Sequence, residues 1–501
     1  MRLPVPSGSR VTVLNLPDDT VVLRPQEPPE PIADVGAAVR DALRYPLSGP
    51  PLEQLVTAGG RVTLVVEPPS LPLPGVPADP RRAALASTIE ELERLGVPSE
   101  RQTILVAGGL ARRAGGRELE ALLAPQARRA FHGTVLVHDA ESRDLRRLGY
   151  AGRIPLRINP ALVETDAVVA VTAAETVLHG GPGALVGASG VAVLRAAGAY
   201  SLLETAASQG WQLGVALERA LAGRVPVIGA SLVLDPPRLG GAFRGYPWSD
   251  ASLDQLARSP VRRLALLPAG ARRRLLDGIP RELGAAAAFA GAPSVAHAEA
   301  LLRGIARRSV ELDEPLDALV VGLPWKHHHH PRERLNPITV AAVALGLALR
   351  LWRDAFPVRD GGTVVLLHRL GRQFQPVTQD PYRAFFHLLR DGVTPDGLVA
   401  EERNAARDQA AIGAYRAGRA CHPLLPYADW DSCRPALGRL GAVVVAGSRD
   451  HATARALGFV PTHGVGPALE MAHGRAGGRA RLGVLLGPPY FPLQVGGDAT
   501  S

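Results

Sequence analysis

Short apolar runs alternate with amphipathic segments along most of the chain. Residues 61–66 are β-branched and apolar, as expected of a parallel strand that is buried on both faces of its sheet. Residues 80–95 then carry apolar side chains at helical spacing. The same reasoning predicts further strands at 11–14, 21–23, 103–107, 134–138, 167–171, 225–234, 318–322, 363–367, 442–446 and 482–486. It predicts further helices at 32–43, 118–123, 339–352, 382–389, 401–416 and 452–457.

Repeated strand–helix units of this length form mostly parallel sheets with helices on both faces. A chain of 501 residues is too long for one ordinary hydrophobic core. We therefore expect an α/β protein with two domains, each a mostly parallel sheet flanked by helices, and a cleft between them. The expected bounds are 1–265 for the N-terminal domain, 266–290 for a linker, 291–490 for the C-terminal domain and 491–501 for a flexible tail.

Composition and charge exclude several classes of protein. Hydrophobic residues make up 46% and charged residues 21%, which is typical of a globular chain and not of a disordered one. The longest apolar run, residues 338–349, is shorter than a membrane span and ends at Arg350, which predicts a buried helix. The net charge of +9 is spread along the chain without an RNA-binding or zinc-finger motif. We therefore expect neither a nucleic-acid partner nor a membrane partner.

Two further features concern the cellular compartment. The N-terminus shows no apolar stretch behind its charge, so no signal peptide is expected. The two cysteines, Cys421 and Cys433, are too few for a disulfide framework in so long a chain and fit a reducing compartment. We expect a cytoplasmic protein.

The chain contains a single lysine, Lys326, and every other basic side chain of the Lys/Arg class is arginine. A GC-rich genome would produce this bias without any functional cause. The chemical consequence is the same either way. A mechanism that needs a lysine amine, as a Schiff base, an amide tether or a general base, must use Lys326.

Two glycine-containing loops follow predicted strands, and in a parallel sheet such loops lie on the binding edge. Gly108 and Gly109 come after the strand at 103–107 and would permit close backbone approach to a ligand, or would only form a tight turn. The loop after 167–171 begins at His179, a residue that can exchange a proton near neutral pH. Its glycines, whose N–H groups could surround an anion, include Gly180, Gly181, Gly183 and Gly187. The alternative is a structural glycine loop with a histidine bonded to backbone.

Other loops offer weaker candidates. Lys326 follows the predicted strand at 318–322 and could meet a substrate carboxylate. In the adjoining run of four histidines, His327 and His329 would share one face and could bind a metal, either by design or adventitiously. The loop after Val66 contains no arginine, and its only acid, Glu67, is a candidate substrate contact. His368 follows the strand at 363–367, and the pair Cys421–His422 is interpreted as structural.

Taken in order, these loops resemble the nickel-dependent lactate racemase family. Residues 46–55, 61–74, 103–119, 179–190 and 227–245 are similar to successive stretches of that family's N-terminal half. The resemblance is continuous over roughly 10–260 and extends at fold level over 290–490. It implies a two-domain α/β fold and a nickel-pincer nucleotide that is attached to a lysine and whose nickel is held by a histidine. Two further histidines exchange the substrate proton in that family.

Carried over by position, the resemblance is incomplete. The second acid–base histidine matches His179. The remaining functional positions of the family fall at about Ala111 for the first histidine, near Ser70 for the arginine, at Ser189 or beside it for the lysine, and near Thr205 for the nickel ligand. Because residues 1–325 contain no lysine, a covalent pincer attached as in the racemases is not expected. A cofactor held without a covalent bond, or attached to Lys326, remains formally open.

Three functions follow from these observations. The first is an isomerase or other enzyme acting on a small 2-hydroxy acid or related carboxylate, with His179 as the acid–base group. The second is a binding protein that has kept the cleft and lost the chemistry. The third is a metal enzyme that uses His327–His330. The missing lysine favours the second over lactate racemisation.

Overall fold

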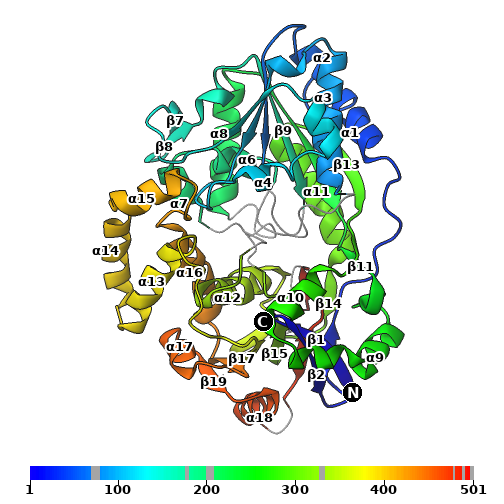
Figure 1. The fold of residues 1–501 in the computed structure, drawn as a ribbon, viewed down its shortest axis with the longest axis vertical. Helices are drawn as coiled ribbons and strands as arrows, with labels where there is room; N and C mark the ends of the chain where they lie inside the picture. The colour runs from blue at the N-terminus through cyan, green and yellow to red at the C-terminus, as the bar shows by residue number, and fades with distance from the viewer. Residues whose placement is uncertain are drawn as a thin grey trace.

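The computed structural model describes residues 1–68, 79–174, 180–198, 208–326, 333–477, 480–487 and 491–496, with the side chain of residue 262 left aside. Two six-stranded sheets, each covered by helices on both faces, form two lobes (Figure 1). The predicted α/β class with two mostly parallel sheets flanked by helices is confirmed. In the part of the chain that is described, no helix is long and apolar enough to cross a membrane.

The first sheet has the strand order β13–β10–β9–β4–β5–β6. All neighbours are parallel except β13, which runs antiparallel to β10. The strands are β4 (Val62–Val66), β5 (Gln102–Val106), β6 (Thr134–Val137), β9 (Ala167–Ala174), β10 (Val227–Leu234) and β13 (Ala285–Gly291). The strand that was predicted at 61–66 is β4, and all five of its side chains are buried, as a strand covered on both faces requires.

Alternation along the strands divides the first lobe into two cores. Leu64 and Val66 of β4 face α1 (Val35–Arg44) and α3 (Pro80–Arg94). Val65, between them, faces the opposite side, where it packs with α6 (Gly183–Gly187), α7 (Val191–Ala197) and α8 (Gln209–Ala222). A further helix, α11 (Pro293–Arg308), contacts β10 and β13. The sheet is therefore buried on both faces, and its carboxyl edge carries the loops.

The second sheet has the order β19–β18–β17–β15–β20–β3, and all of its strands are parallel. They are β3 (Val21–Leu23), β15 (Leu316–Gly322), β17 (Val358–Leu367), β18 (Ala442–Ala446), β19 (Val460–Thr462) and β20 (Leu482–Leu485). One face packs against α12 (Pro337–Ala341), α13 (Asp380–Arg390) and α16 (Leu425–Leu437). The other packs against α9 (Asp250–Arg258), α18 (Val465–Ala476) and the hairpin of β1 (Arg2–Ser7) and β2 (Arg10–Asn15).

The pairing of strands crosses the predicted domain bounds in two places. β3, near the N-terminus, is the edge strand of the second sheet. β13, formed by the alanine-rich residues of the expected linker, is the edge strand of the first sheet. The chain therefore passes between the lobes more than once (Figure 1).

Three helix predictions are wrong in detail. The helix predicted at 118–123 is α4 (Gly116–Leu119), which ends before most of the predicted residues. The apolar segment predicted at 339–352 is buried as expected, but α12 ends at Ala341 and the backbone continues as a π turn and a 3₁₀ turn. Its tight packing against α16 sets this path, because a Cβ on Gly346 would lie 1.9 Å from Oγ of Ser432. The predicted helix at 401–416 is two helices, α14 (Pro395–Ala405) and α15 (Gln409–Arg416), since Asp408 caps the N-terminus of α15. Both cysteines are free and buried.

Candidate functional site

The carboxyl edge of the first sheet brings together the loops that were predicted to share it. β4 lies between β5 and β9, and the three strands are parallel. Glu67, Gly108 and Gly180 therefore come after the carboxyl ends of these strands, at one edge of the sheet. The backbone N–H of Gly180 donates to Oε1 of Glu67 at 2.8 Å. The N–H of Gly181 donates to Oγ1 of Thr172 at 2.9 Å. The loop after β9 is therefore anchored to the ends of β4 and β9.

Close packing explains the glycines on the α6 side of this edge. Gly109 donates its N–H to the carbonyl oxygen of Gly187 at 3.0 Å. A Cβ on Gly187 would lie 2.6 Å from the carbonyl oxygen of Ala107, a distance that real Cβ atoms do not reach. Gly183 begins α6 and donates its N–H to the carbonyl oxygen of Gly180 at 2.9 Å. These glycines are needed for backbone approach within the protein itself.

Gly180 and Gly181 pack against a histidine that the sequence did not single out. A Cβ on Gly180 would lie 2.0 Å from Cε1 of His297, and one on Gly181 would lie 2.3 Å from its Cβ. Both glycines have positive φ, at +114° and +51°. His297 lies on α11 and is fully buried, with Nδ1 2.9 Å from Oγ of Ser231. The glycine pair is thus the contact between the loop after β9 and α11.

A second buried histidine, His138, fixes the far end of the glycine-rich segment that runs from Gly180 to Gly190. It follows β6, and its Nε2 lies 2.8 Å from the carbonyl oxygen of Ser189. Nδ1 lies 3.1 Å from Nδ2 of Asn159, which can only donate. This arrangement fixes the tautomer with the proton on Nε2. Burial lowers the pKa of His138 to about 4, so the ring is neutral at pH 7.

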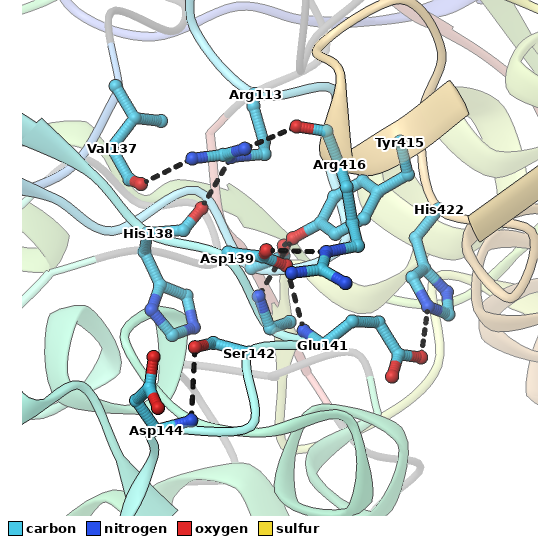
Figure 2. A network of polar contacts seen from close by, with 12 residues as sticks. Arg113, Val137, His138, Asp139, Glu141, Ser142, Asp144, Tyr415, Arg416 and His422 are labelled. Atoms are coloured by element: carbon cyan, nitrogen blue, oxygen red, sulfur yellow. Dashed lines mark hydrogen bonds and ion pairs between the residues drawn. The ribbon is translucent and has the colours of Figure 1, made fainter. Parts of the chain in front are cut away.

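The second lobe contacts this edge through α15 and the loop that follows it (Figure 2). The hydroxyl of Tyr415 donates to the carbonyl oxygen of Gly109 at 2.8 Å and accepts from the N–H of Ala140 at 3.2 Å. Nε2 of His422 lies 3.0 Å from Oε1 of Glu141. The backbone N–H of His422 donates to the carbonyl oxygen of Leu110 at 2.9 Å. The Gly108–Gly109 loop is therefore held from both lobes.

Charged groups reinforce the same junction. Arg113 donates to the carbonyl oxygens of His138 and Val137 at 3.1 and 2.8 Å, and also to that of Arg416 (Figure 2). Nε of Arg416 in turn donates to Oδ2 of Asp139 at 2.9 Å. Each guanidinium thus joins an element of one lobe to backbone or carboxylate of the other.

A buried ion pair lies deeper between the lobes. Nε of Arg112 is 3.3 Å from Oε1 of Glu333, and its Nη2 also contacts Glu118. Glu333 is buried, and Nε2 of Gln379 donates to its other oxygen at 3.2 Å. Burial raises the pKa of Glu333 above its usual range, although Arg112 acts in the opposite direction. This group couples the glycine loop after β5 to the segment that precedes α12.

The remaining predicted residues lie apart from this edge or outside the described residues. Lys326 follows β15, pairs with Oδ1 of Asp277 at 2.8 Å and lies over the ring of Trp325. Nδ1 of His368 is shielded from solvent and has no hydrogen-bond partner, and burial lowers the pKa of this histidine to about 4. Three predicted residues, His179, His327 and His329, lie outside the described residues.

The residues present do not fit a covalently attached pincer cofactor. Ser189, where the resemblance places the lysine, is fully buried; its hydroxyl donates to the carbonyl oxygen of Val186 at 2.5 Å. Ala111, where it places the first histidine, is a buried apolar residue. Among the residues whose positions are given, no group of three or more His, Cys, Asp or Glu side chains could hold a metal ion.

Residues 8–182 match the lactate racemase N-terminal domain. This segment contains the ends of β4, β5, β6 and β9, together with the Glu67–Gly180 contact. No curated protein matches the sequence as a whole.

Two solved structures share the fold over almost the full length. The lactate racemase apoprotein from Thermoanaerobacterium thermosaccharolyticum is 15% identical, with a TM-score of 0.63, and the alignment covers 98% of this chain and 100% of that one. A protein from Thermotoga maritima is 13% identical, with a TM-score of 0.51, covering 94% and 100%. At these identities the likeness shows the fold alone.

Proposed function

We propose that the protein binds a small 2-hydroxy acid or a related carboxylate at the carboxyl edge of the first sheet, without a covalently attached nickel-pincer cofactor. The observation that carries the proposal is the hydrogen bond from Gly180 to Glu67 within the segment that matches the racemase domain. It anchors the glycine loop beside the Gly108–Gly109 loop. His179 immediately precedes this contact and is the proposed acid–base group.

Glu67 is better suited to positioning this loop than to binding a carboxylate. Its Oε1 already accepts the N–H of Gly180, and two carboxylates facing one another would repel. We propose that Glu67 holds the start of the glycine loop and that backbone N–H groups with His179 meet the ligand. Lys326 remains a proposed carboxylate contact, for which its pairing with Asp277 would have to open.

The proposed function differs from lactate racemisation because residues that racemase chemistry needs are missing from this chain. The buried Ser189 and the apolar Ala111 replace groups that the family's chemistry requires, and residues 1–325 contain no lysine. A binding protein that has lost catalysis and an isomerase with another mechanism both fit this pattern. A second candidate function is metal chemistry at His327–His330. It is supported only by the run of four histidines.

Binding is tested by calorimetry of the untagged protein with D-lactate, L-lactate and glycolate. Glu67→Ala removes the acceptor of Gly180 and should weaken binding about tenfold, a loss typical of a hydrogen bond to a charged group. Glu67→Gln keeps an acceptor oxygen and should restore most of the affinity. His179→Ala should also weaken binding, while Glu100→Ala, an exposed acid in the same lobe, should leave it unchanged.

The outcomes separate the alternatives. If His179→Ala binds every tested acid as well as the parent protein, the site assignment is wrong. If Glu67→Gln loses as much affinity as Glu67→Ala, Glu67 acts on the ligand through its charge and not through the loop. Chiral chromatography of lactate after incubation with the protein then distinguishes an isomerase, which converts one enantiomer to the other, from a binding protein, which does not.

A further inference from the structure

Four arginines gather at the carboxyl edge of the second sheet. Arg369 follows β17, Arg449 follows β18, Arg10 begins β2, and Arg272 lies on α10 (Ala269–Asp277). After burial, the positive charges of Arg369, Arg272 and Arg449 lower the pKa of Arg10 to about 10. Burial, followed by the charges of Arg449 and Arg272, likewise lowers the pKa of Arg369. Four cations from four elements therefore share one region.

Backbone contacts fix this region to the strand ends. β15, β17 and β18 are parallel neighbours, so their carboxyl ends lie side by side. The turn of the β1–β2 hairpin reaches this edge, because the N–H of Gly8 donates to the carbonyl oxygen of Leu323 at 2.8 Å. Nε of Arg272 is 3.2 Å from Oγ of Ser9 in the same turn. The N–H of Arg449 donates to the carbonyl oxygen of Leu370 at 3.2 Å.

The cluster extends from the surface into the protein, and no described carboxylate forms an ion pair with its arginines. Arg272 is only 8% exposed, Arg10 is half-buried, and Arg369 and Arg449 are exposed. Nε of Arg10 is shielded from solvent and has no hydrogen-bond partner. Among the described residues, none of the four forms an ion pair with a carboxylate, whereas many other arginines of the chain do. Holding like charges together without anions costs free energy, which a bound anion would offset.

We propose that Arg10, Arg272, Arg369 and Arg449 bind the phosphate group of a small ligand. Guanidinium groups match phosphate geometry with paired N–H donors, and several of them around one site suit a dianion better than a single carboxylate. The carboxyl edge of a parallel sheet is also where small ligands of such folds bind. The nearby Arg273, whose guanidinium interacts with that of Arg272 and lies over the ring of Trp325, extends the positive surface beside the cluster.

A nucleic acid fits the observations less well. A nucleic-acid surface usually presents exposed Lys and Arg side chains in a long stripe. Here Arg272 is buried and Arg10 is half-buried, and the cluster is confined to the carboxyl ends of neighbouring strands. The site stands independently of the proposed 2-hydroxy-acid site, since it uses the other sheet and none of the same residues.

The test is titration of the full-length untagged protein with inorganic phosphate and with methyl phosphate at constant ionic strength. Sodium chloride and sodium sulfate serve as anion controls, and a single-stranded oligonucleotide serves as the nucleic-acid probe. The variants are Arg10→Gln and Arg449→Gln. Arg153→Gln, an exposed arginine in the turn between β7 (Arg146–Ala151) and β8 (Ile154–Ile158), is the control with the same change of charge.

We expect saturable binding of one or both phosphates, weakened about tenfold or more by each cluster variant and unchanged by Arg153→Gln. Tighter binding of methyl phosphate would indicate a phosphate ester as the ligand, and tighter binding of inorganic phosphate the free ion. Arg449 is exposed, so its variant tests the site even if Arg10→Gln fails to fold. The proposal is overturned if phosphate binds no better than sulfate and chloride, if Arg153→Gln loses as much affinity, or if only the oligonucleotide binds.

Discussion

Tyr415→Phe tests whether the lobes are joined as described, because its buried hydroxyl is one of the contacts between them. The hydroxyl donates to the carbonyl oxygen of Gly109 and accepts from the N–H of Ala140 in a buried environment. Burial raises the pKa of Tyr415 well above its usual value, so the group remains a protonated donor at neutral pH. Phenylalanine leaves two backbone groups without this partner, and each such loss costs about 1–3 kcal/mol. We expect destabilisation by about 2–6 kcal/mol.

Thermal unfolding followed by calorimetry measures the effect. For a cooperative unit of about 150–250 residues, 1 kcal/mol corresponds to about 2–4 °C, so Tm should fall by at least about 4 °C. The control is Tyr150→Phe, because Tyr150 is 61% exposed and its hydroxyl only accepts from Nη1 of Arg147 at 3.0 Å. That variant should shift Tm by less than about 1 °C. Equal Tm values for the two variants would refute the reasoning about the buried hydroxyl.

Two further predictions concern the same edge of the first sheet. The pKa of His138 is lowered to about 4 from an ordinary 6.5, so its contribution to stability is complete above pH 6.5 and is lost as the pH falls toward 4. The gap corresponds to about 3 kcal/mol, and His138→Gln should flatten this part of the pH dependence of urea unfolding; an unchanged slope would contradict it. Gly187→Ala should lower the stability by about 2 kcal/mol or more through its clash with Ala107, whereas Gly116→Ala, with nothing within 4 Å, should be neutral. A Gly187→Ala protein with the parent Tm would show that the α6 loop can move aside.

The strands of the two sheets could be predicted because their own sequences carry the pattern of a buried strand. Residues 62–66, 318–322 and 442–446 are continuous apolar runs, and buried parallel strands require that pattern. β13 was assigned to a linker, because its run of alanines has neither alternation nor β-branched residues. It forms a strand through pairing with β10, more than fifty residues earlier in the chain. Such long-range pairing leaves no local signal.

The candidate site was predictable to the same extent. Glu67, Gly108 and Gly180 were assigned to one edge because strand–helix alternation predicts parallel strands, whose carboxyl ends share an edge, and the structure places them there. His138 and His297 were missed as parts of the site. Their roles depend on contacts with Ser189 and with the Gly180–Gly181 pair, at separations that no local pattern encodes. The position of His138 as the last residue of the predicted strand at 134–138 was the available signal.

This chain is predicted not to carry the tethered cofactor of the racemases. Intact-mass spectrometry tests this prediction most directly. The untagged protein would be made in nickel-supplemented cells that synthesise the pincer nucleotide, and its mass would be compared with that of the Ser189→Ala variant. We predict the mass of the unmodified polypeptide for both proteins, since the first lobe contains no lysine and Ser189 is buried. A cofactor adduct on the parent protein, together with one bound nickel per chain, would contradict the account.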